Sequence, residues 1–463
     1  MGIDRWARMV VGVGAIVATM TAGGTPGALA ATSNTRTPSG PVGFGCVPNV
    51  EGPIAATDQS KPYVAVLQYE VPPGWVDEEY FISCASPMLT YKTTVIVRKP
   101  ANPKRASGIV AVDPLHSAGL WGMMTLLQPY WVDRGDIHVG VVAGSVPLQA
   151  FVKPSNPARY DSLEIPATPE ATNEILAGVG ALLHQHPDAL LGKAKFHAAI
   201  LGGWSQTAVV TRAFIASPQG SGTIDGQPLY DGYFPGQAAV GSSGGAQVQA
   251  IPDTKVPVME LQGERELLVT ESVYGTLGYR RPDSPTYRLY EVAAMSHVNN
   301  EPGNAVAAFG RSVTCEWPPG ATPSEFSQTQ IWDVAFDHLA HWITDGTPPP
   351  KAPRIKLEAD GRTVVRDQHG NAVGGVRSVY VDVPTASIMP TSLAPGGVLS
   401  NPCAYLGYQL DFSTDTLEHL YTSHAGYAKA VAKRVGQLVD EGYLLPSAAR
   451  EQIATARNSS ILS

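Results

Sequence analysis

The stretch Ala198-Ala199-Ile200-Leu201-Gly202-Gly203-Trp204-Ser205-Gln206-Thr207-Ala208-Val209-Val210 decides the fold of this chain. An apolar run of strand type leads into a glycine pair, and a helix-compatible stretch begins directly after Ser205. This order predicts a tight strand-to-helix turn, a nucleophile elbow, that presents a serine hydroxyl at the edge of a sheet. Small residues suit such a turn because its backbone is strained and the strand and helix pass close together. The serine is therefore a candidate nucleophile, and an acid and a histidine are expected downstream of it.

Nearly continuous apolar runs recur along the chain, as in strands that are covered on both faces. They lie at residues 93–98, 108–113, 137–144, 196–201, 256–261 and 287–292. Segments of helix length lie at residues 118–131, 169–186, 207–216 and 325–344. The alternation predicts an α/β fold with a mostly parallel central sheet, flanked by helices and joined by right-handed crossovers.

Segments rich in glycine and proline divide the chain into regions. Residues 31–44 are rich in Ser, Thr, Pro and Gly and are expected to form a flexible lead-in. Residues 45–350 are expected to form the catalytic domain, which ends where a glycine and three prolines stop the last helix. Residues 351–463 are expected to form a C-terminal extension of loops and helices packed on that domain, with helices within 414–457.

Two later segments supply partners for Ser205. The apolar run that ends at Gly263 is followed by Glu264 and Glu266, and the run 287–292 is followed by His297. Loops at the carboxyl edge of an open α/β sheet are where such a fold builds its site. The chain order Ser, acid, His is that of α/β-hydrolases. Glu266 is slightly favoured as the acid, with Glu264 as the alternative, and the other glutamate is expected to be a solvated charge.

Each residue type has a chemical role. A serine hydroxyl is scarcely ionised near neutral pH, so a base must take its proton during attack. Histidine can accept that proton and return it to the leaving group. The carboxylate fixes the histidine tautomer and stabilises the imidazolium. Two backbone N–H donors are needed for the oxyanion, and they are predicted at Gln206 and at Leu115 or His116. Trp204 and Trp121 are candidate substrate contacts, whereas Trp131 is expected to pack in the core.

The N-terminal thirty residues have the features of a secretory signal peptide. Arg5 and Arg8 precede an apolar stretch, and Ala28-Leu29-Ala30 is a small-residue cleavage pattern, so cleavage is expected after Ala30. The apolar stretch is short for a membrane span, and stable membrane insertion is not expected. The net charge of −8 becomes −9 when two arginines and one aspartate are removed, which argues against nucleic acid as a partner. A secreted or extracytoplasmic location is predicted.

Four cysteines are present, Cys46, Cys84, Cys315 and Cys403. An even number in an exported protein indicates two disulfides, and three pairings are possible. The pairing Cys46–Cys84 with Cys315–Cys403 is favoured, because the first pair flanks one N-terminal segment and the second can fasten the C-terminal region to the body. The spacing matches no zinc pattern, so no metal site and no cofactor are expected.

Several of these segments are similar to a known family. The chain resembles the bacterial, secreted alpha/beta hydrolase domain-containing proteins, which are regarded as serine esterases. Their elbow has the form Gly-x-Ser-Gln-Ser-Gly, and here it reads Gly203-Trp204-Ser205-Gln206-Thr207-Ala208. Their strand Arg-Leu-x-Glu-Val-Ala-Gly before the histidine reads here Arg288-Leu289-Tyr290-Glu291-Val292-Ala293-Ala294. Residues 342–349, 367–377 and 381–385 are similar as well. The resemblance implies the α/β-hydrolase fold and an esterase reaction class.

The chain departs from the family pattern at two places. Thr207 and Ala208 replace a smaller Ser-Gly pair, which tightens the turn without removing a catalytic group. The acid loop reads Gly263-Glu264-Arg265-Glu266 where relatives tend to have Thr-Glu-x-Asp, so either glutamate can take the acid role.

The sequence therefore predicts a secreted serine hydrolase that cleaves a small-molecule carboxylic ester through an acyl-enzyme at Ser205. Two alternatives remain open. One is an acyltransferase that uses the same triad with an alcohol in place of water. The other is a catalytically inactive binding protein on the same fold.

Overall fold

A computed structural model describes residues 44–63, 70–86, 89–238, 249–268, 276–298, 313–392 and 402–463. The signal peptide expected at residues 1–30, and the lead-in expected at 31–44 except for its last residue, lie outside the described residues. Within the ranges just given, no helix is both long enough and apolar enough to cross a membrane.

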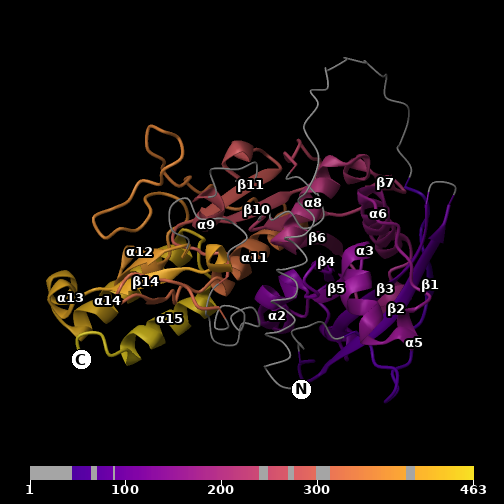
Figure 1. The fold of residues 1–463 in the computed structure, drawn as a ribbon, viewed down its shortest axis with the longest axis horizontal. Coiled ribbons are helices and arrows are strands. Elements are labelled where there is room, and N and C mark those ends of the chain that lie inside the picture. Colours follow the sequence, from indigo (N-terminus) through magenta and orange to yellow (C-terminus); the bar gives the residue numbers. More distant parts are fainter. Residues whose placement is uncertain are drawn as a thin grey trace.

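A nine-stranded sheet forms the centre of the molecule, with strand order β1-β2-β3-β5-β4-β6-β9-β10-β11 (Figure 1). Neighbouring strands run parallel from β5 to β11, and the pairs β1/β2, β2/β3 and β3/β5 are antiparallel. The mostly parallel sheet confirms the predicted fold class. The strand bounds are β1 Asn49–Glu51, β2 Trp75–Ala85, β3 Thr90–Pro100, β4 Ile109–Pro114, β5 Ile137–Val141, β6 Ala198–Trp204, β9 Gly232–Gly236, β10 Val258–Gly263 and β11 Tyr287–Val292.

The central strands are buried along their whole length, which explains why their sequences are apolar on both faces. Helix α8 packs against β4, β6 and β9, and α2 packs against α11 and the strands β4 to β6. The main helices of the body are α2 Gly122–Arg134, α6 Pro169–Gln185, α8 Gln206–Ala216, α9 Glu264–Leu268 and α11 Thr329–Asp345. Shorter elements are η1 Pro103–Arg105, α3 Ser145–Pro147, η2 Leu148–Val152, α4 Lys153–Ser155, α5 Pro157–Tyr160, α7 Asp188–Leu191, η3 Pro218–Ser221, β7 Thr223–Ile224, β8 Gln227–Pro228 and η4 Thr276–Tyr279.

Strand β2 was not predicted from the apolar pattern because it carries adjacent charges. Its Asp77 faces Arg98 on β3 in the strand register, and the two side chains form an ion pair of 2.7 Å. Glu78, which lies opposite Val97, forms a diagonal ion pair with Lys99 at 2.7 Å. The charges are thus cross-strand partners, which stabilise an antiparallel pair once the register is known.

Strand β9 was also missed, because its sequence Gly-Tyr-Phe-Pro-Gly contains the residues that usually interrupt strands. It nevertheless lies between β6 and β10 in the centre of the sheet. Gly236 at its end allows a close approach, since a Cβ built there would lie 2.0 Å from the ring of Trp332. The strand is therefore fitted to its neighbours by its small residues rather than by β-propensity.

The C-terminal elements gather at the end of the molecule away from β1 to β3, as the orange and yellow ribbon of Figure 1 shows. A three-stranded sheet of order β12-β14-β13 lies there, and its strand β12 comes from the segment before residue 351. Isolated bridges from Val292 to Val376 and from Val298 to Leu406 join this layer to the body. The elements are β12 Thr322–Pro323, α12 Val379–Asp382, β13 Ala386–Met389, η5 Pro402–Tyr405, β14 Tyr408–Asp411, α13 Thr414–Tyr421, α14 His424–Asp440 and α15 Pro446–Asn458.

The structure pairs the four cysteines in the favoured way. Cys46 bonds to Cys84 on β2, and Cys315 bonds to Cys403 on η5. The second bond joins two cysteines that are 88 residues apart in the sequence. It fastens η5 to the segment around Cys315.

Candidate active site

Ser205 lies at the turn between β6 and α8, with φ 60° and ψ −122°. A non-glycine residue rarely adopts a positive φ, and such a residue is held there by its surroundings. The N–H of Ser205 donates to the carbonyl of Gly236 at 3.1 Å. Gly203 lets the helix come close to the strand, because a Cβ at this position would lie 2.4 Å from the backbone of Thr207. These features are those of a nucleophile elbow.

Thr207, one of the departures from the family pattern, takes part in the turn through its hydroxyl. Its Oγ1 accepts a hydrogen bond from the N–H of Trp204 at 3.0 Å and donates to the carbonyl of Trp204 at 2.9 Å. The larger residue is therefore accommodated by bonds that tie the end of the strand to the first turn of the helix. The turn keeps its shape although a serine has been replaced by a β-branched residue.

The structure brings Ser205, His297 and Glu266 together in one hydrogen-bonded chain. His297 Nε2 lies 2.9 Å from Ser205 Oγ, and His297 Nδ1 lies 2.8 Å from Glu266 Oε1. All three are buried, with Ser205 the most exposed at 8%. Each residue follows a different strand of the sheet, β6, β10 or β11. The carboxyl ends of these parallel strands meet at one edge, so side chains that are distant in sequence come into contact there.

The two glutamates of the acid loop have different partners. Glu266 accepts the N–H of Gly263 at 2.9 Å through Oε2 and reaches His297 through Oε1. Glu264 instead forms an ion pair with Arg366 at 2.5 Å and accepts the N–H of Ala294 at 2.7 Å. The expectation that one glutamate is a solvated charge is wrong, because both are buried: Glu264 is fully enclosed and Glu266 is 2% exposed. Glu264, which does not bond to His297, stabilises the loop before the histidine through its bond to Ala294.

The surroundings of His297 favour a neutral imidazole. Burial lowers its pKa below the usual value, against the hydrogen bond and negative charge of Glu266, which raise it, and the charge of Arg265 adds to the lowering. With Glu266 accepting the Nδ1 proton, Nε2 carries the lone pair and can accept the Ser205 proton. The serine and the imidazole are therefore arranged for proton transfer.

Two aromatic rings pack next to the imidazole. The ring of Trp204 stacks on His297 with a centroid distance of 4.8 Å and an interplanar angle of 21°. The ring of Tyr405 lies 5.3 Å away, and the guanidinium of Arg265 lies 4.7 Å from the Tyr405 ring. Trp204, predicted as a substrate contact, thus has the histidine ring as a packing partner.

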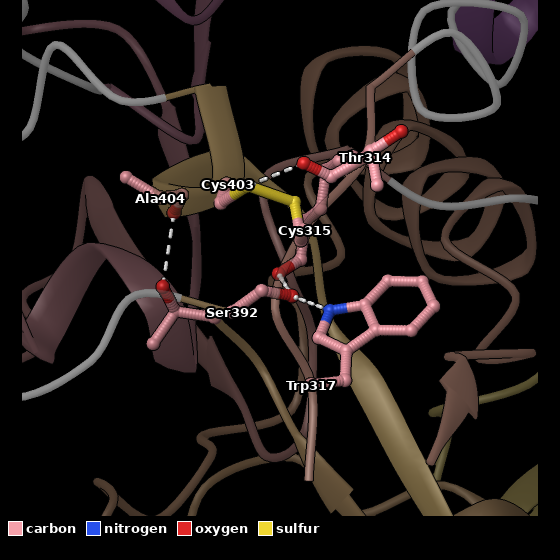
Figure 2. Close-up of a disulfide and its surroundings, with 8 residues drawn as sticks. Thr314, Cys315, Trp317, Ser392, Cys403 and Ala404 are labelled. Atoms are coloured by element: carbon pink, nitrogen blue, oxygen red, sulfur yellow. Dashed lines mark hydrogen bonds between the residues drawn. A yellow bond between two sulfur atoms is a disulfide. The ribbon is translucent and has the colours of Figure 1, made fainter. Parts of the chain in front are cut away.

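Tyr405 and Arg265 were not found from the sequence. Arg265 donates from Nε to the carbonyl of Ala404 at 2.9 Å, which fixes η5 beside the acid loop. The Cys315–Cys403 disulfide fixes the same short helix, and Figure 2 shows Ala404 next to that bond. The one sequence signal for Tyr405 is its position two residues after a cysteine expected to be bonded.

Gln237 was missed as well. Its amide oxygen accepts the indole N–H of Trp204 at 3.2 Å and that of Trp332 at 3.1 Å. Its amide nitrogen donates to the carbonyl of Ser296 at 2.9 Å, in the residue before the histidine. One fully buried amide therefore links the elbow to the histidine loop. Gln237 was not predicted because it directly follows β9, a strand that the sequence pattern does not indicate.

Two predictions for the oxyanion loop are corrected by the structure. The N–H of Leu115 donates to the carbonyl of Val141 at 2.8 Å, and the N–H of His116 donates to the carbonyl of Leu120 at 2.9 Å. Neither backbone donor is free, because the loop folds back on itself and continues the pairing of β4 with β5. Gln206 is the first residue of α8, so its N–H lies in the first helical turn, where no preceding helix carbonyl can accept it.

Trp121 is a further correction. Predicted as a substrate contact, it is buried at the start of α2, and its ring packs edge-on against His138 with centroids 5.8 Å apart. A Cβ built on Gly140 would lie 3.0 Å from the same indole, so the ring fills space against β5. Trp131, expected in the core, packs against Phe336 there. Trp121 is therefore a core residue.

Across the described ranges, no group of three His, Cys, Asp or Glu side chains is arranged to hold a metal ion.

The comparisons with known proteins give the class of the chain. Residues 50–454 match the alpha/beta hydrolase domain family, and the chain belongs to this family. A search of curated protein sequences finds no match. Among solved structures, it is similar to a protein from Klebsiella pneumoniae subsp. pneumoniae described as a dienelactone hydrolase, at 13% identity and a TM-score of 0.26, over 41% of this chain and 74% of that one.

Two further likenesses are to esterases. Brefeldin A esterase, a bacterial homologue of human hormone-sensitive lipase, is 13% identical with a TM-score of 0.24, over 36% of this chain and 41% of that one. A cold-adapted esterase from an Arctic intertidal metagenomic library is 14% identical with a TM-score of 0.24, over 40% of this chain and 71% of that one. The chain thus spans less than half the length of the brefeldin A esterase.

Proposed function

We propose that the protein is a serine hydrolase that cleaves carboxylic esters, with Ser205 as nucleophile, His297 as general base and acid, and Glu266 as the orienting acid. The observation that carries this proposal is the pair of hydrogen bonds, 2.9 Å and 2.8 Å long, that joins the three side chains at the elbow. A neutral histidine between a serine hydroxyl and a carboxylate is the arrangement that activates a serine for acyl transfer.

The reaction follows from these positions. The Ser205 oxygen attacks the acyl carbon of the ester while its proton passes to His297 Nε2. The carbonyl oxygen becomes the oxyanion of a tetrahedral intermediate and accepts the N–H of Gln206. The imidazolium, stabilised by Glu266, gives its proton to the leaving alcohol as the acyl–oxygen bond breaks. Water then attacks the acyl-enzyme by the same route, which releases the acid and restores the serine.

We also propose that the protein acts outside the cytoplasm, after cleavage following Ala30. The two disulfides support this location, because such bonds persist in oxidising compartments. The signal peptide itself is tested by N-terminal sequencing of the protein from the culture medium or periplasm. A chain that begins at Ala31 supports the proposal, and an uncleaved chain in the cytoplasm contradicts it.

The test of the activity is hydrolysis of p-nitrophenyl esters of graded acyl length by the wild type and by Ser205→Ala. We expect the variant to lose at least 10⁴-fold in kcat, since one member of such a triad carries most of the rate. Ser221→Ala is the matched control, because Ser221 lies exposed in η3 and bonds only locally, to the carbonyl of Pro218. Undiminished hydrolysis by Ser205→Ala would overturn the assignment.

The same assay separates the alternatives. In the presence of a competing alcohol, a hydrolase yields mainly the free acid and an acyltransferase yields mainly the new ester. An inactive binding protein hydrolyses none of the esters and shows no difference between the wild type and Ser205→Ala.

A further inference from the structure

His116 is a half-buried histidine beside the catalytic candidates that the reaction above does not use. It follows β4 in the loop that faces the elbow, and its ring lies 5.9 Å from the ring of Trp204, which stacks on His297. Burial lowers the pKa of His116 to about 3, and the nearby His297 adds to the lowering. The ring is therefore neutral at any pH at which the enzyme would act.

The tautomer of His116 follows from its own loop. The N–H of Ala118 donates to His116 Nδ1 at 3.0 Å, so Nδ1 carries a lone pair and the ring proton is on Nε2. Nε2 is buried and has no hydrogen-bond partner among the residues that the structure describes. Buried N–H groups are almost always paired, because leaving one without a partner keeps the cost of its desolvation uncompensated. An unpaired donor of this kind is poised for a ligand.

The backbone of the loop offers no competing donor from residue 115 to residue 119. Each N–H in this stretch donates within the protein: Leu115 to Val141 O, His116 to Leu120 O, Ser117 to Gln206 Oε1, Ala118 to His116 Nδ1 and Gly119 to His116 O. The bond from Ser117, 3.3 Å long, also places the loop directly against Gln206, whose own N–H is the first oxyanion donor.

We propose that the Nε2–H of the His116 imidazole is the second donor of the oxyanion hole and binds the carbonyl oxygen of the ester as it becomes negative. This inference rests on the proposed function. Histidine side chains can serve as preorganised donors of this kind. The neutral ring donates a hydrogen bond without giving up its proton, and the Trp204 ring lies next to both His116 and His297. The position predicted for the second donor is thus retained at His116, with the side chain in place of the backbone.

The experiment compares His116→Ala, His116→Phe and His116→Gln with the wild type. Loss of one oxyanion donor typically lowers kcat about 10²- to 10³-fold. We expect losses in this range for the Ala and Phe variants, with KM changed less than fivefold, because the bond forms in the transition state. Gln restores an N–H donor and should recover at least tenfold of the kcat. His341→Ala, on the exposed side of α11, is the control.

A second readout does not depend on turnover. A trifluoromethyl ketone forms a tetrahedral adduct with the serine, and its inhibition constant should rise by the same factor as kcat falls. A merely structural role for His116 would raise KM and the inhibition constant together and would not be rescued by Gln. Thermal denaturation of each variant identifies any that fail to fold.

The outcomes are distinguishable. If Ser205→Ala is inactive while His116→Ala and His116→Phe keep kcat within fivefold of wild type, the assignment of His116 is overturned and the proposed function stands. If Ser205→Ala is fully active, the proposed function itself fails.

Discussion

Replacing Gly203 by alanine tests the geometry on which the elbow depends. A Cβ at this position would lie 2.4 Å from the carbonyl carbon and oxygen of Thr207 and 2.7 Å from the nitrogen of Ala208. These are backbone atoms in the first turn of α8, so no side-chain rotation can relieve the contact. The turn must open, and the serine and the Gln206 N–H must move with it.

The expected size follows from the contact. Inserting a methyl group into a packed site costs about 1–3 kcal/mol, so the free energy of unfolding of Gly203→Ala should fall by at least that amount. A displacement of about 1 Å at a reacting group costs about 100-fold in rate. We therefore expect kcat/KM to fall at least 100-fold under conditions in which the variant is folded.

Gly436→Ala is the matched control, the same chemical change in an open place. Gly436 is exposed within α14, and a Cβ there would meet nothing within 4 Å. Alanine is favoured over glycine in a helix by about 1 kcal/mol, so this variant should be more stable and equally active. Urea unfolding with the disulfides kept intact measures the free energy of unfolding of both variants. A Gly203→Ala protein that is as stable and active as Gly436→Ala would refute the account of the elbow.

Three other perturbations have defined outcomes. Glu266→Gln should lower kcat about 10⁴-fold, and Glu264→Gln should lower it at least tenfold less, because Glu264 bonds away from the imidazole; equal losses would contradict the assignment of the acid. The pH dependence of kcat/KM reports the protonation of His297, which must be neutral to act as the base. Because burial lowers the pKa of His297, the midpoint of the acid limb should lie below pH 6.5, and activity should fall only as the pH drops through that midpoint. Because Glu266 raises that pKa, the residual activity of Glu266→Gln should have its midpoint at still lower pH, and a midpoint above 6.5 in the wild type would be inconsistent with the buried site. Finally, the double variant Cys315→Ser/Cys403→Ser opens a loop of 88 residues. In the chain-entropy model this lowers the free energy of unfolding by about 4–5 kcal/mol. An unchanged free energy of unfolding in urea would show that this bond does not restrain the chain.

The elements around the candidate site could be predicted because local sequence determines them. The strand before Ser205 and the helix after it follow from an apolar run, two glycines and a helix-compatible stretch, and strand β11 occupies the range 287–292 that its apolar pattern predicts. The choice between Glu264 and Glu266 could not be made from the sequence. It depends on which carboxylate Arg366 binds, and Arg366 is about a hundred residues away.

The features that were missed depend on contacts between distant segments. The charges of β2 look unlike a buried strand until Arg98 and Lys99 are placed beside them on the neighbouring strand. Tyr405 reaches His297 only because the fold and a disulfide bring η5 to the histidine loop. The prediction of the His116 backbone N–H as an oxyanion donor was wrong for the same reason. This N–H donates to the carbonyl of Leu120 in a turn that the local sequence pattern does not specify.

Reaction of the folded protein with a fluorophosphonate probe tests the central claim most directly, because the probe bonds only to a serine that a neighbouring base has activated. We predict one adduct per chain by intact mass, located at Ser205 by peptide mapping, and its loss in His297→Ala and in heat-denatured protein. A folded protein that takes up no probe, or that carries it on another serine, would contradict the account.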